Sequence, residues 1–381
     1  MSRPPSGPLA GLLVADFSRV LAGPYATMML GDLGADVTKV ERPPRGDDTR
    51  AWGPPHAPDG TATYFQSVNR NKQTLWLDLT DPGDRAQALA LALSADVLVE
   101  NFAPGAMARF GLDHETLSAR NPRLVYASIT GFGAGAGAAM PGYDLLVQAM
   151  GGLMSVTGPA PDQPTKVGVA LVDVVTGLHA TVGILAALHE RAVSGRGQHV
   201  AVNLLSSTLS AMVNQSQAAV GAGVTPRAMG NAHPSIAPYQ TLPTADGVIA
   251  LAVGNDGQFA ALCAVLGLDL ADDPGFATNP ARVARRDTLA DLIGRVLASR
   301  PTAYWVGALT AAGVPAGPVN DLPAALALAE SLGLSPIVDA AGVPTVANPI
   351  TLSRTPVDYR LAPPAPLSTT SEASGSTTFD E

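Results

Sequence analysis

The sequence predicts an α/β protein with a doubly wound, Rossmann-like large domain and a second, smaller α/β domain. In roughly the first half of the chain, apolar runs of strand length alternate with segments of helical apolar spacing. A separate strand and several Ala- and Leu-rich helical segments follow Asp246-Gly247, which indicates the smaller domain. The 381 residues, 46% of them hydrophobic, are sufficient for two or three domain-sized units.

The N-terminal segment has the pattern of a βαβ unit. The apolar run 12–17 predicts a strand, Gly23-Pro24 opens a helix that Gly34 closes, and residues 36–41 again have strand character. The same alternation continues along the chain. It predicts strands at 74–79, 96–99 and 124–129 and a helix at 84–93.

The later elements set the expected domain boundaries. A long apolar helix is predicted at 171–191, with a strand at 198–202, a second helical stretch at 204–221 and another strand at 248–253. The last residues are rich in Pro, Ser and Thr and lack apolar periodicity. We expect a large domain from 1–203 and 326–362, a linker helix region at 204–229, a small domain at 230–325 and a disordered tail at 363–381.

Composition excludes several functional classes. The formal net charge of -9 disfavours nucleic acid as a partner. Cys263 is the single cysteine, so an intrachain disulfide or a multi-cysteine metal site is excluded, and the six histidines lack metal-ligand spacing. The apolar run 178–188 is too short to span a bilayer, and Asp16 and Arg19 interrupt the N-terminal apolar segment. We therefore expect a cytoplasmic protein without metal or membrane association.

Asp173 is the first candidate for chemistry because an acid among apolar residues is costly unless hydrogen bonds or a function hold it there. The sequence around Asp173, taken alone, allows it to be a helix N-cap, a buried structural acid or a functional carboxylate. The glycines of 131–137 satisfy a dinucleotide fingerprint only superficially and indicate a surface loop. Neither a nucleophile elbow nor a P-loop motif occurs, so serine hydrolase and P-loop NTPase activities are not predicted.

Basic side chains gather near the ends of the predicted N-terminal strands. Two interpretations stay open: a site for a polyanion such as a nucleotide diphosphate, or ordinary solvated surface charges. The residues concerned are Lys39, Arg42, Arg70, Lys72 and Arg109.

Short motifs, taken together and in order from about residue 8 to about residue 360, resemble the class III CoA-transferases. That superfamily includes formyl-CoA transferase, carnitine CoA-transferase and α-methylacyl-CoA racemase. The motifs are Asp16-Phe17-Ser18, Ala22-Gly23-Pro24, Leu33 to Pro43, Asn69 to Lys72, Leu77-Asp78-Leu79, Val99 to Phe102, Pro104-Gly105, Gly142-Tyr143-Asp144, Gly195 to Gln198, Gly230 to Pro234 and Val314 to Pro318.

The resemblance implies an interlocked homodimer and a CoA-transferase that moves coenzyme A from an acyl-CoA donor to a carboxylic acid. It identifies Asp173 with the family's nucleophile, which passes through an aspartyl anhydride and an aspartyl-CoA thioester. Acyl-CoA, CoA and the acids are substrates here, and no tightly bound cofactor is implied. Water must be excluded, because each intermediate is open to hydrolysis.

The resemblance also assigns binding residues. Arg42 corresponds to the arginine at the adenine and phosphate end of CoA, and Tyr143 lies where the family places a residue beside the thioester. The loop with Gly230, Asn231 and His233 corresponds to a segment that contacts the acyl group. The other expected CoA contacts are Leu77, Leu79, Thr80, Asn101, Phe102 and Arg109.

Departures from the family pattern leave the acyl group unassigned. Leu21 replaces a glutamine of formyl-CoA transferase, and the loop at 230–233 lacks that enzyme's glycine run. Tyr143 stands where the racemases carry a histidine, and a tyrosine of ordinary pKa is a poor base at neutral pH. Two alternatives stay open: an α-methylacyl-CoA racemase or epimerase, and a non-catalytic acyl-CoA-binding protein.

Overall fold

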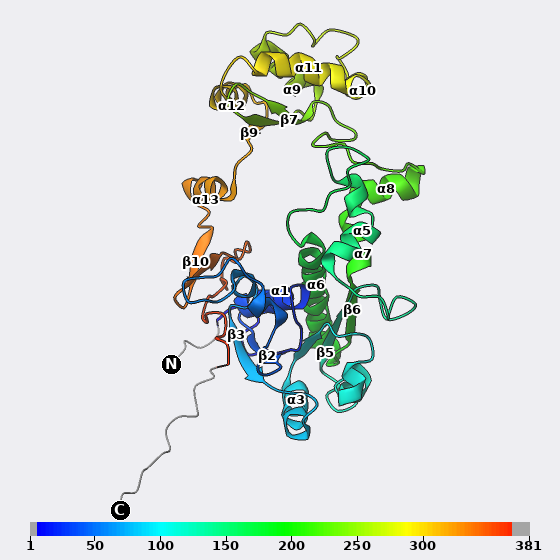
Figure 1. Cartoon of the computed structure of the whole chain (residues 1–381), viewed down its shortest axis with the longest axis vertical. Coiled ribbons are helices and arrows are strands. Elements are labelled where there is room, and N and C mark those ends of the chain that lie inside the picture. Colours follow the sequence, from blue (N-terminus) through cyan, green and yellow to red (C-terminus); the bar gives the residue numbers. More distant parts are fainter. Residues whose placement is uncertain (1–5, 368–381) are drawn as a thin grey trace, which may run out of the picture. The chain divides into compact units, whose positions relative to one another are not determined.

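The computed structural model describes residues 6–367 (Figure 1). The chain forms two compact units. One comprises Met1–Gly151, Gly168–Ser216 and Ser335–Glu381, and the other comprises Gly152–Val167 and Gln217–Leu334. Of the predicted disordered tail, residues 363–367 contain no helix or strand, and residues 368–381 lie outside the described residues.

The first unit is built on a six-stranded sheet with the order β3-β2-β1-β4-β5-β6, in which every pair is parallel. Helices cover both faces, which confirms the predicted doubly wound α/β class. The order reverses between β1 and β4, and ligands of such sheets bind beyond the carboxyl ends of the strands at that point. The strands are β1 (Leu13–Asp16), β2 (Asp36–Glu41), β3 (Lys72–Trp76), β4 (Val97–Glu100), β5 (Val125–Thr130) and β6 (His199–Asn203).

The helices of the first unit match the predicted alternation, with one break. The predicted helix at 204–221 is two helices, because Val213 adopts a φ of 34° that an α-helix cannot contain. The helices are α1 (Ala22–Asp32), α2 (Thr63–Gln66), α3 (Pro82–Ser94), α4 (His114–Ser118), α5 (Asp144–Met150), α6 (Leu171–Ser194), α7 (Leu204–Ala211) and the start of α8 (Val213–Ala222), with 3-10 turns at Asp48–Ala51 and Met107–Phe110 and a hairpin of β10 (Ile337–Ala340) and β11 (Val343–Val346).

Helix α6 packs on α1 and on strands β5 and β6. Gly177 permits the close approach to α1, because a Cβ at this position would lie 2.6 Å from the carbonyl oxygen of Ala22. Among the described helices, α6 alone is long and apolar enough to cross a membrane, a criterion that core helices of soluble proteins also meet. Packing within the first unit covers only one face of α6, and Leu178 and Val182 on this helix remain exposed.

The second unit has its own core. A three-stranded antiparallel sheet packs with Phe259, Ile293 and Trp305 in one buried apolar cluster. The elements are β7 (Tyr239–Pro243), β8 (Val248–Ala252) and β9 (Ala316–Pro318), with α9 (Asp256–Leu266), α10 (Asn279–Ala284), α11 (Arg286–Leu297), α12 (Thr302–Ala311), α13 (Leu322–Ser331) and a 3-10 turn at Leu153–Val156.

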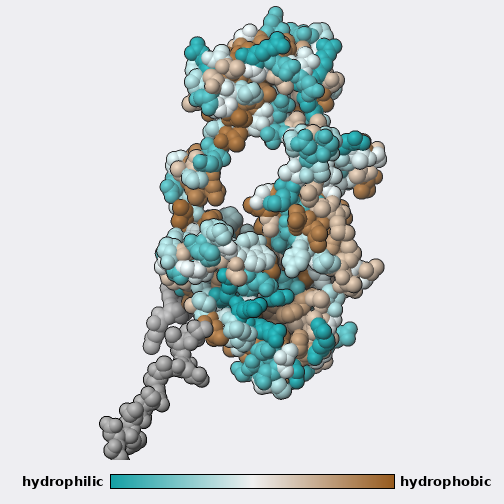
Figure 2. Space-filling view, viewed as in Figure 1, coloured by the Kyte–Doolittle hydropathy of each residue, from teal (hydrophilic) through white to brown (hydrophobic). Residues whose placement is uncertain are grey.

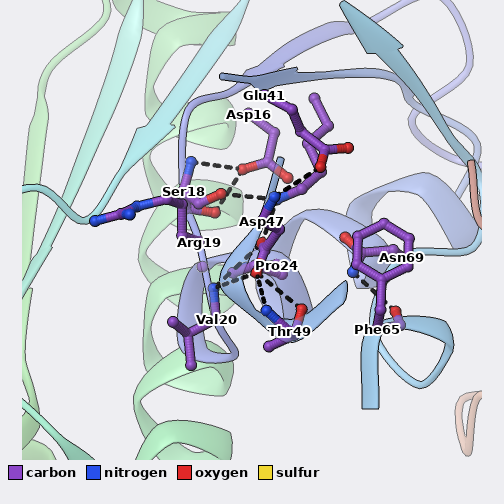
Figure 3. A network of polar contacts seen from close by, with 12 residues as sticks. Asp16, Ser18, Arg19, Val20, Pro24, Glu41, Asp47, Thr49, Phe65 and Asn69 are labelled. Carbon is purple, nitrogen blue, oxygen red and sulfur yellow. Dashed lines mark hydrogen bonds and ion pairs between the residues drawn. The ribbon is translucent and has the colours of Figure 1, made fainter. Parts of the chain in front are cut away.

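One buried ion pair joins β3 to β1 and another joins β2 to the loop that follows it, and Figure 3 labels their carboxylates, Asp16 and Asp47. Lys72 Nζ lies 3.0 Å from Asp16 Oδ2, and Lys39 Nζ lies 2.9 Å from Asp47 Oδ2, with all four side chains fully buried. Burial alone would raise the pKa of Asp16, but the charges of Lys72 and Lys39 outweigh it and hold this pKa at about 2. Strand β3 begins at Lys72 and ends at Trp76, earlier than the predicted 74–79, and Lys72 already pairs with Val37 of β2.

We expect Lys72→Met to lower the free energy of unfolding by about 3 kcal/mol, because Asp16 then lacks its nearest buried counter-charge. Urea unfolding at neutral pH measures the loss. Lys166→Met is the matched control, since Lys166 is exposed and the same substitution there changes stability by less than about 0.5 kcal/mol. Equal effects of the two substitutions would contradict a stabilising role for the buried pair.

Candidate active site

A first cavity of about 620 Å³ lies at the carboxyl ends of β2, β3 and β4. Five residues of the sequence-based site line it together: Arg42, Leu77, Leu79, Thr80 and Phe102. The Arg42 guanidinium contacts Asp78 at 3.1 Å, and its side chain is 70% exposed, so it is available to a ligand. Arg19 and Arg45 supply further positive charge at this cavity.

The sequence allowed the five basic residues near the strand ends to be either a polyanion site or solvated surface charges, and three of them are neither. Lys39, Lys72 and Arg70 are buried, and each is paired with a carboxylate. Arg70 binds Asp32 at 2.6 Å. These cations stabilise the fold and are neither solvated surface charges nor free ligands for a polyanion.

A second cavity of about 430 Å³ adjoins the first, because Arg19, Asp48 and Phe102 line both. The second cavity brings Asn101, Phe102, Tyr143 and Asp173 together, with Leu21 beside them. A glycine pair permits this arrangement: a Cβ on Gly131 would lie 2.4 Å from Gly142 Cα, so the loop after β5 and the loop before Tyr143 touch backbone to backbone. The nucleophile candidate and seven predicted binding residues thus line two adjoining cavities at the switch point.

Asp173 lies in the first turn of α6, and the helix begins at Leu171 with Ala170 in the N-cap position. Asp173 is therefore not the N-cap that its sequence allowed. Asp144 satisfies the free amides instead: its Oδ1 accepts from the N–H of Val172 at 2.8 Å and of Asp173 at 3.2 Å. One carboxylate thus fixes the turn that carries the other.

The electrostatic setting makes Asp173 an unusual carboxyl group. Burial disfavours its charge, and the nearby charge of Asp144 adds to this, so the pKa of Asp173 rises from 3.8 to about 7. A carboxylate of this pKa is a stronger base than an ordinary aspartate, and its partial desolvation removes water that would otherwise stabilise it. Perturbed acids in cavities are typical of catalytic sites.

Sequence reasoning missed two groups near Asp173. Asp144 belongs to a quoted motif, but its capping of a helix 28 residues away has no sequence signal. Tyr64 in α2 is the other: burial, with the charges of Asp173, Asp144 and Asp47, raises its pKa to about 12. Tyr64 therefore stays a neutral hydroxyl, and its ring packs edge-on against Trp52.

Four predicted site residues lie outside these cavities. Arg109 is exposed in the 3-10 turn Met107–Phe110 and lines neither cavity. Gly230, Asn231 and His233 belong to the second unit, where the Asn231 amide donates to Thr241 Oγ1 at 2.7 Å and His233 Nδ1 accepts from the Ser235 N–H at 3.1 Å. Across residues 6–367, no cluster of three or more potential metal ligands was found.

We expect Asp173→Asn to stabilise the protein increasingly as pH rises. In the unfolded wild type Asp173 ionises above its pKa of about 3.9, whereas in the folded protein it stays protonated until about pH 7. The free energy of unfolding of the wild type therefore falls as pH rises through this window, and that of the Asn variant does not. The advantage of the variant should grow by on the order of 2 kcal/mol between pH 5 and pH 8. Unfolding curves at both pH values measure it. A constant difference would argue against the raised pKa.

The chain matches known CoA-transferases over nearly its whole length. The model of CoA-transferase family III matches residues 9–367. The chain is 44% identical to a succinate–glutarate CoA-transferase of Agrobacterium fabrum, covering 94% of this chain and 92% of the relative. It is 41% identical to an acetyl-CoA:oxalate CoA-transferase of Acetobacter aceti, covering 92% and 90%.

A solved structure agrees with these relatives. A CAIB/BAIF family protein from Brucella suis superposes with a TM-score of 0.85 at 42% identity, covering 94% of this chain and 96% of that one. The resemblance found in the sequence is therefore confirmed by sequence and by fold. The chain belongs to CoA-transferase family III and is a CoA-transferase.

Proposed function

We propose that this enzyme moves CoA from an acyl-CoA donor to a carboxylic acid through covalent intermediates on Asp173. The observation that carries the proposal is the position of Asp173: a carboxyl group with a pKa of about 7 lines a cavity that adjoins a larger, arginine-lined one. The larger cavity suits the nucleotide end of CoA, and the smaller one suits the thioester. Arg42, Leu77, Leu79 and Thr80 are the proposed nucleotide contacts.

Four displacements complete the reaction without net consumption of protons. The Asp173 carboxylate attacks the donor thioester carbonyl, the C–S bond breaks, and CoA thiolate leaves a mixed anhydride. The thiolate attacks the aspartyl carbonyl, releasing the donor acid and leaving an aspartyl-CoA thioester. The acceptor carboxylate displaces the thiolate to form a second anhydride. Attack of the thiolate on the acceptor carbonyl yields the new acyl-CoA and regenerates Asp173.

The remaining site residues take supporting roles in this proposal. Phe102 lines both cavities and would contact the pantetheine arm between them. Tyr143 lies beside the thioester, and Asn101 acts through the backbone of Arg19, which both ends of its amide bind. Arg109 and the loop of Gly230, Asn231 and His233 stay predictions from family resemblance, as does a cytoplasmic location.

The substrate class we propose is dicarboxylic acids. Both relatives named above act, by their names, on dicarboxylic acids: succinate and glutarate in one, oxalate in the other. Identity above 40% over at least nine-tenths of this chain supports the same class of acid here. Leu21 at the second cavity is compatible with an aliphatic chain between two carboxylates.

We expect a covalent adduct on Asp173 when the enzyme meets a suitable donor. Intact-protein mass spectrometry after mixing with succinyl-CoA, acetyl-CoA or other acyl-CoA esters should show an added mass that hydroxylamine removes and that peptide mapping places at Asp173. The rate of its formation should rise with pH through about 7, because the ionised carboxylate is the nucleophile.

Asp173→Asn is the control for this experiment and should show no adduct. If several donors bind but none modifies Asp173, the covalent mechanism is wrong. Exchange of the α-proton with deuterated solvent would then support the racemase alternative. Binding with neither adduct nor exchange would support a non-catalytic acyl-CoA-binding protein.

We also propose a homodimer, of the interlocked kind that the family resemblance implies. Helices α5, α6 and α7 pack against one another and expose large apolar side chains, and Figure 2 shows apolar surface in this region. Exposed large apolar side chains gathered on neighbouring helices are typical of interfaces between subunits. The exposed side chains are Leu145, Leu146, Met150, Leu178, Val182 and Leu209.

Analytical ultracentrifugation should therefore give a mass of two 38.7-kDa chains at micromolar concentration. Met150→Glu places a charge in the exposed apolar surface and should shift the protein toward the monomer, because an unpaired charge in an apolar interface is costly. Val193→Glu, on the exposed side near the end of α6, is the comparison. A wild-type monomer across this range would refute the dimer.

A further inference from the structure

The loop between β1 and α1 lies at the boundary of the two cavities. Three side chains line both cavities, Arg19 from this loop together with Asp48 and Phe102. Arg19 was noted in the sequence only because it interrupts an apolar segment. Its place in the fold gives it access to ligands in either space.

The backbone of this loop is rigidly held. The Asn101 side chain binds both backbone polar groups of Arg19: the Arg19 N–H donates to Oδ1 at 2.8 Å, and Nδ2 donates to the Arg19 carbonyl at 2.7 Å. The N–H of Val20 donates to the Asp47 carboxylate, 3.3 Å from each oxygen. Val20 has a φ of 69°, which is rare for a β-branched residue and persists only where surrounding contacts enforce it.

The side chain of Arg19 is held much less firmly. It extends away from the buried network in Figure 3. Its guanidinium lies 5.6 Å from the Phe102 ring centroid and forms an ion pair with Asp48 at 3.2 Å. Both members of the pair are about half exposed, at 50% and 53%. Such pairs contribute about 0–1 kcal/mol, so an incoming anion can replace Asp48 at little cost.

The distribution of charge distinguishes the two cavities. The first cavity has exposed Arg42 and Arg45 in addition to Arg19, so phosphate groups there have other partners. Among the described residues that line the second cavity, Arg19 is the only Lys, Arg or His, while Asp48 and Asp173 are acidic. A dicarboxylate that reacts through one end at Asp173 brings a second negative charge into this space, and Arg19 is the cation in the lining of this cavity that can neutralise it.

We propose that Arg19 binds the distal carboxylate of a dicarboxylate substrate, releasing Asp48 to solvent, and thereby selects dicarboxylates over monocarboxylates. Asn101 and Asp47 are positioning residues, because they fix the backbone from which the guanidinium extends. The proposal rests on the transferase function proposed above and adds the residue that reads the second carboxylate.

A competition between two five-carbon acids tests this directly. Glutarate and valerate differ in the distal carboxylate. When both are present at equal concentration with one donor, succinyl-CoA, the ratio of glutaryl-CoA to valeryl-CoA formed initially equals the ratio of their kcat/KM values. Donor steps cancel from this ratio. Arg19→Gln should lower the ratio by on the order of 10- to 100-fold, because a hydrogen bond to a charged group is lost. Arg19→Lys should retain part of the preference.

Two matched arginine variants serve as controls. Arg42→Gln should raise KM for succinyl-CoA without changing the ratio, and Arg120→Gln, at an exposed position that lines neither cavity, should change neither quantity. If Arg19→Gln raises KM for succinyl-CoA and leaves the ratio unchanged, Arg19 binds a phosphate of CoA and the inference is overturned. A wild type that does not prefer glutarate overturns it as well.

Binding without turnover separates this inference from the proposed function. Glutarate should protect Arg19 from modification by phenylglyoxal, as mapped by peptide mass spectrometry, and valerate should not. Protection by glutarate in an enzyme that forms no adduct would retain the carboxylate site while the covalent mechanism fails. Equal protection by both acids, or by neither, would refute the role of Arg19 even in an active transferase.

Discussion

The buried pairing of two lysines with two aspartates is the constraint on which the rest of the large unit depends. Lys72 of β3 pairs with Asp16 and Lys39 of β2 pairs with Asp47, and the Lys39 ammonium also donates to the carbonyl of Ser18 at 2.8 Å. Charges removed from water in this way are tolerated only with good geometry on every partner. The ends of the first three strands and the loop after β1 are therefore fixed relative to one another.

That rigidity has a functional consequence at the switch point of the sheet. Asp47 takes part in the buried pair and also accepts from Val20, so the same carboxylate that stabilises the fold also holds the loop at the cavities. The exposed cations at the cavities are held less firmly, because Arg19 and Arg42 each pair with a partly exposed aspartate. The buried ion pairs hold the backbone in place, while the partly exposed arginines can exchange an aspartate for a ligand anion. This arrangement suits an enzyme that must bind and release polyanionic CoA esters repeatedly.

The environment of Asp173 shows a second use of paired acids. Asp144 organises the first turn of α6 through backbone hydrogen bonds and, through its charge, makes Asp173 harder to ionise. Helix N-termini ordinarily favour negative charge, so burial and the neighbouring carboxylate outweigh that effect here. Asp173 is therefore a carboxyl group whose pKa lies near neutral pH and whose anion is reactive because it is poorly hydrated.

The sequence by itself determined the alternation of strands and helices, the doubly wound class and the family, because apolar periodicity and the order of short motifs are local properties of the chain. It placed Arg42, Leu77 and Phe102 at strand ends that do share a cavity. Only the tertiary structure decided that Lys39 and Lys72 are buried and that Asp144 caps the helix of Asp173. Such roles depend on which strands the crossovers make neighbours, and contacts between residues far apart in the chain leave no periodic signal.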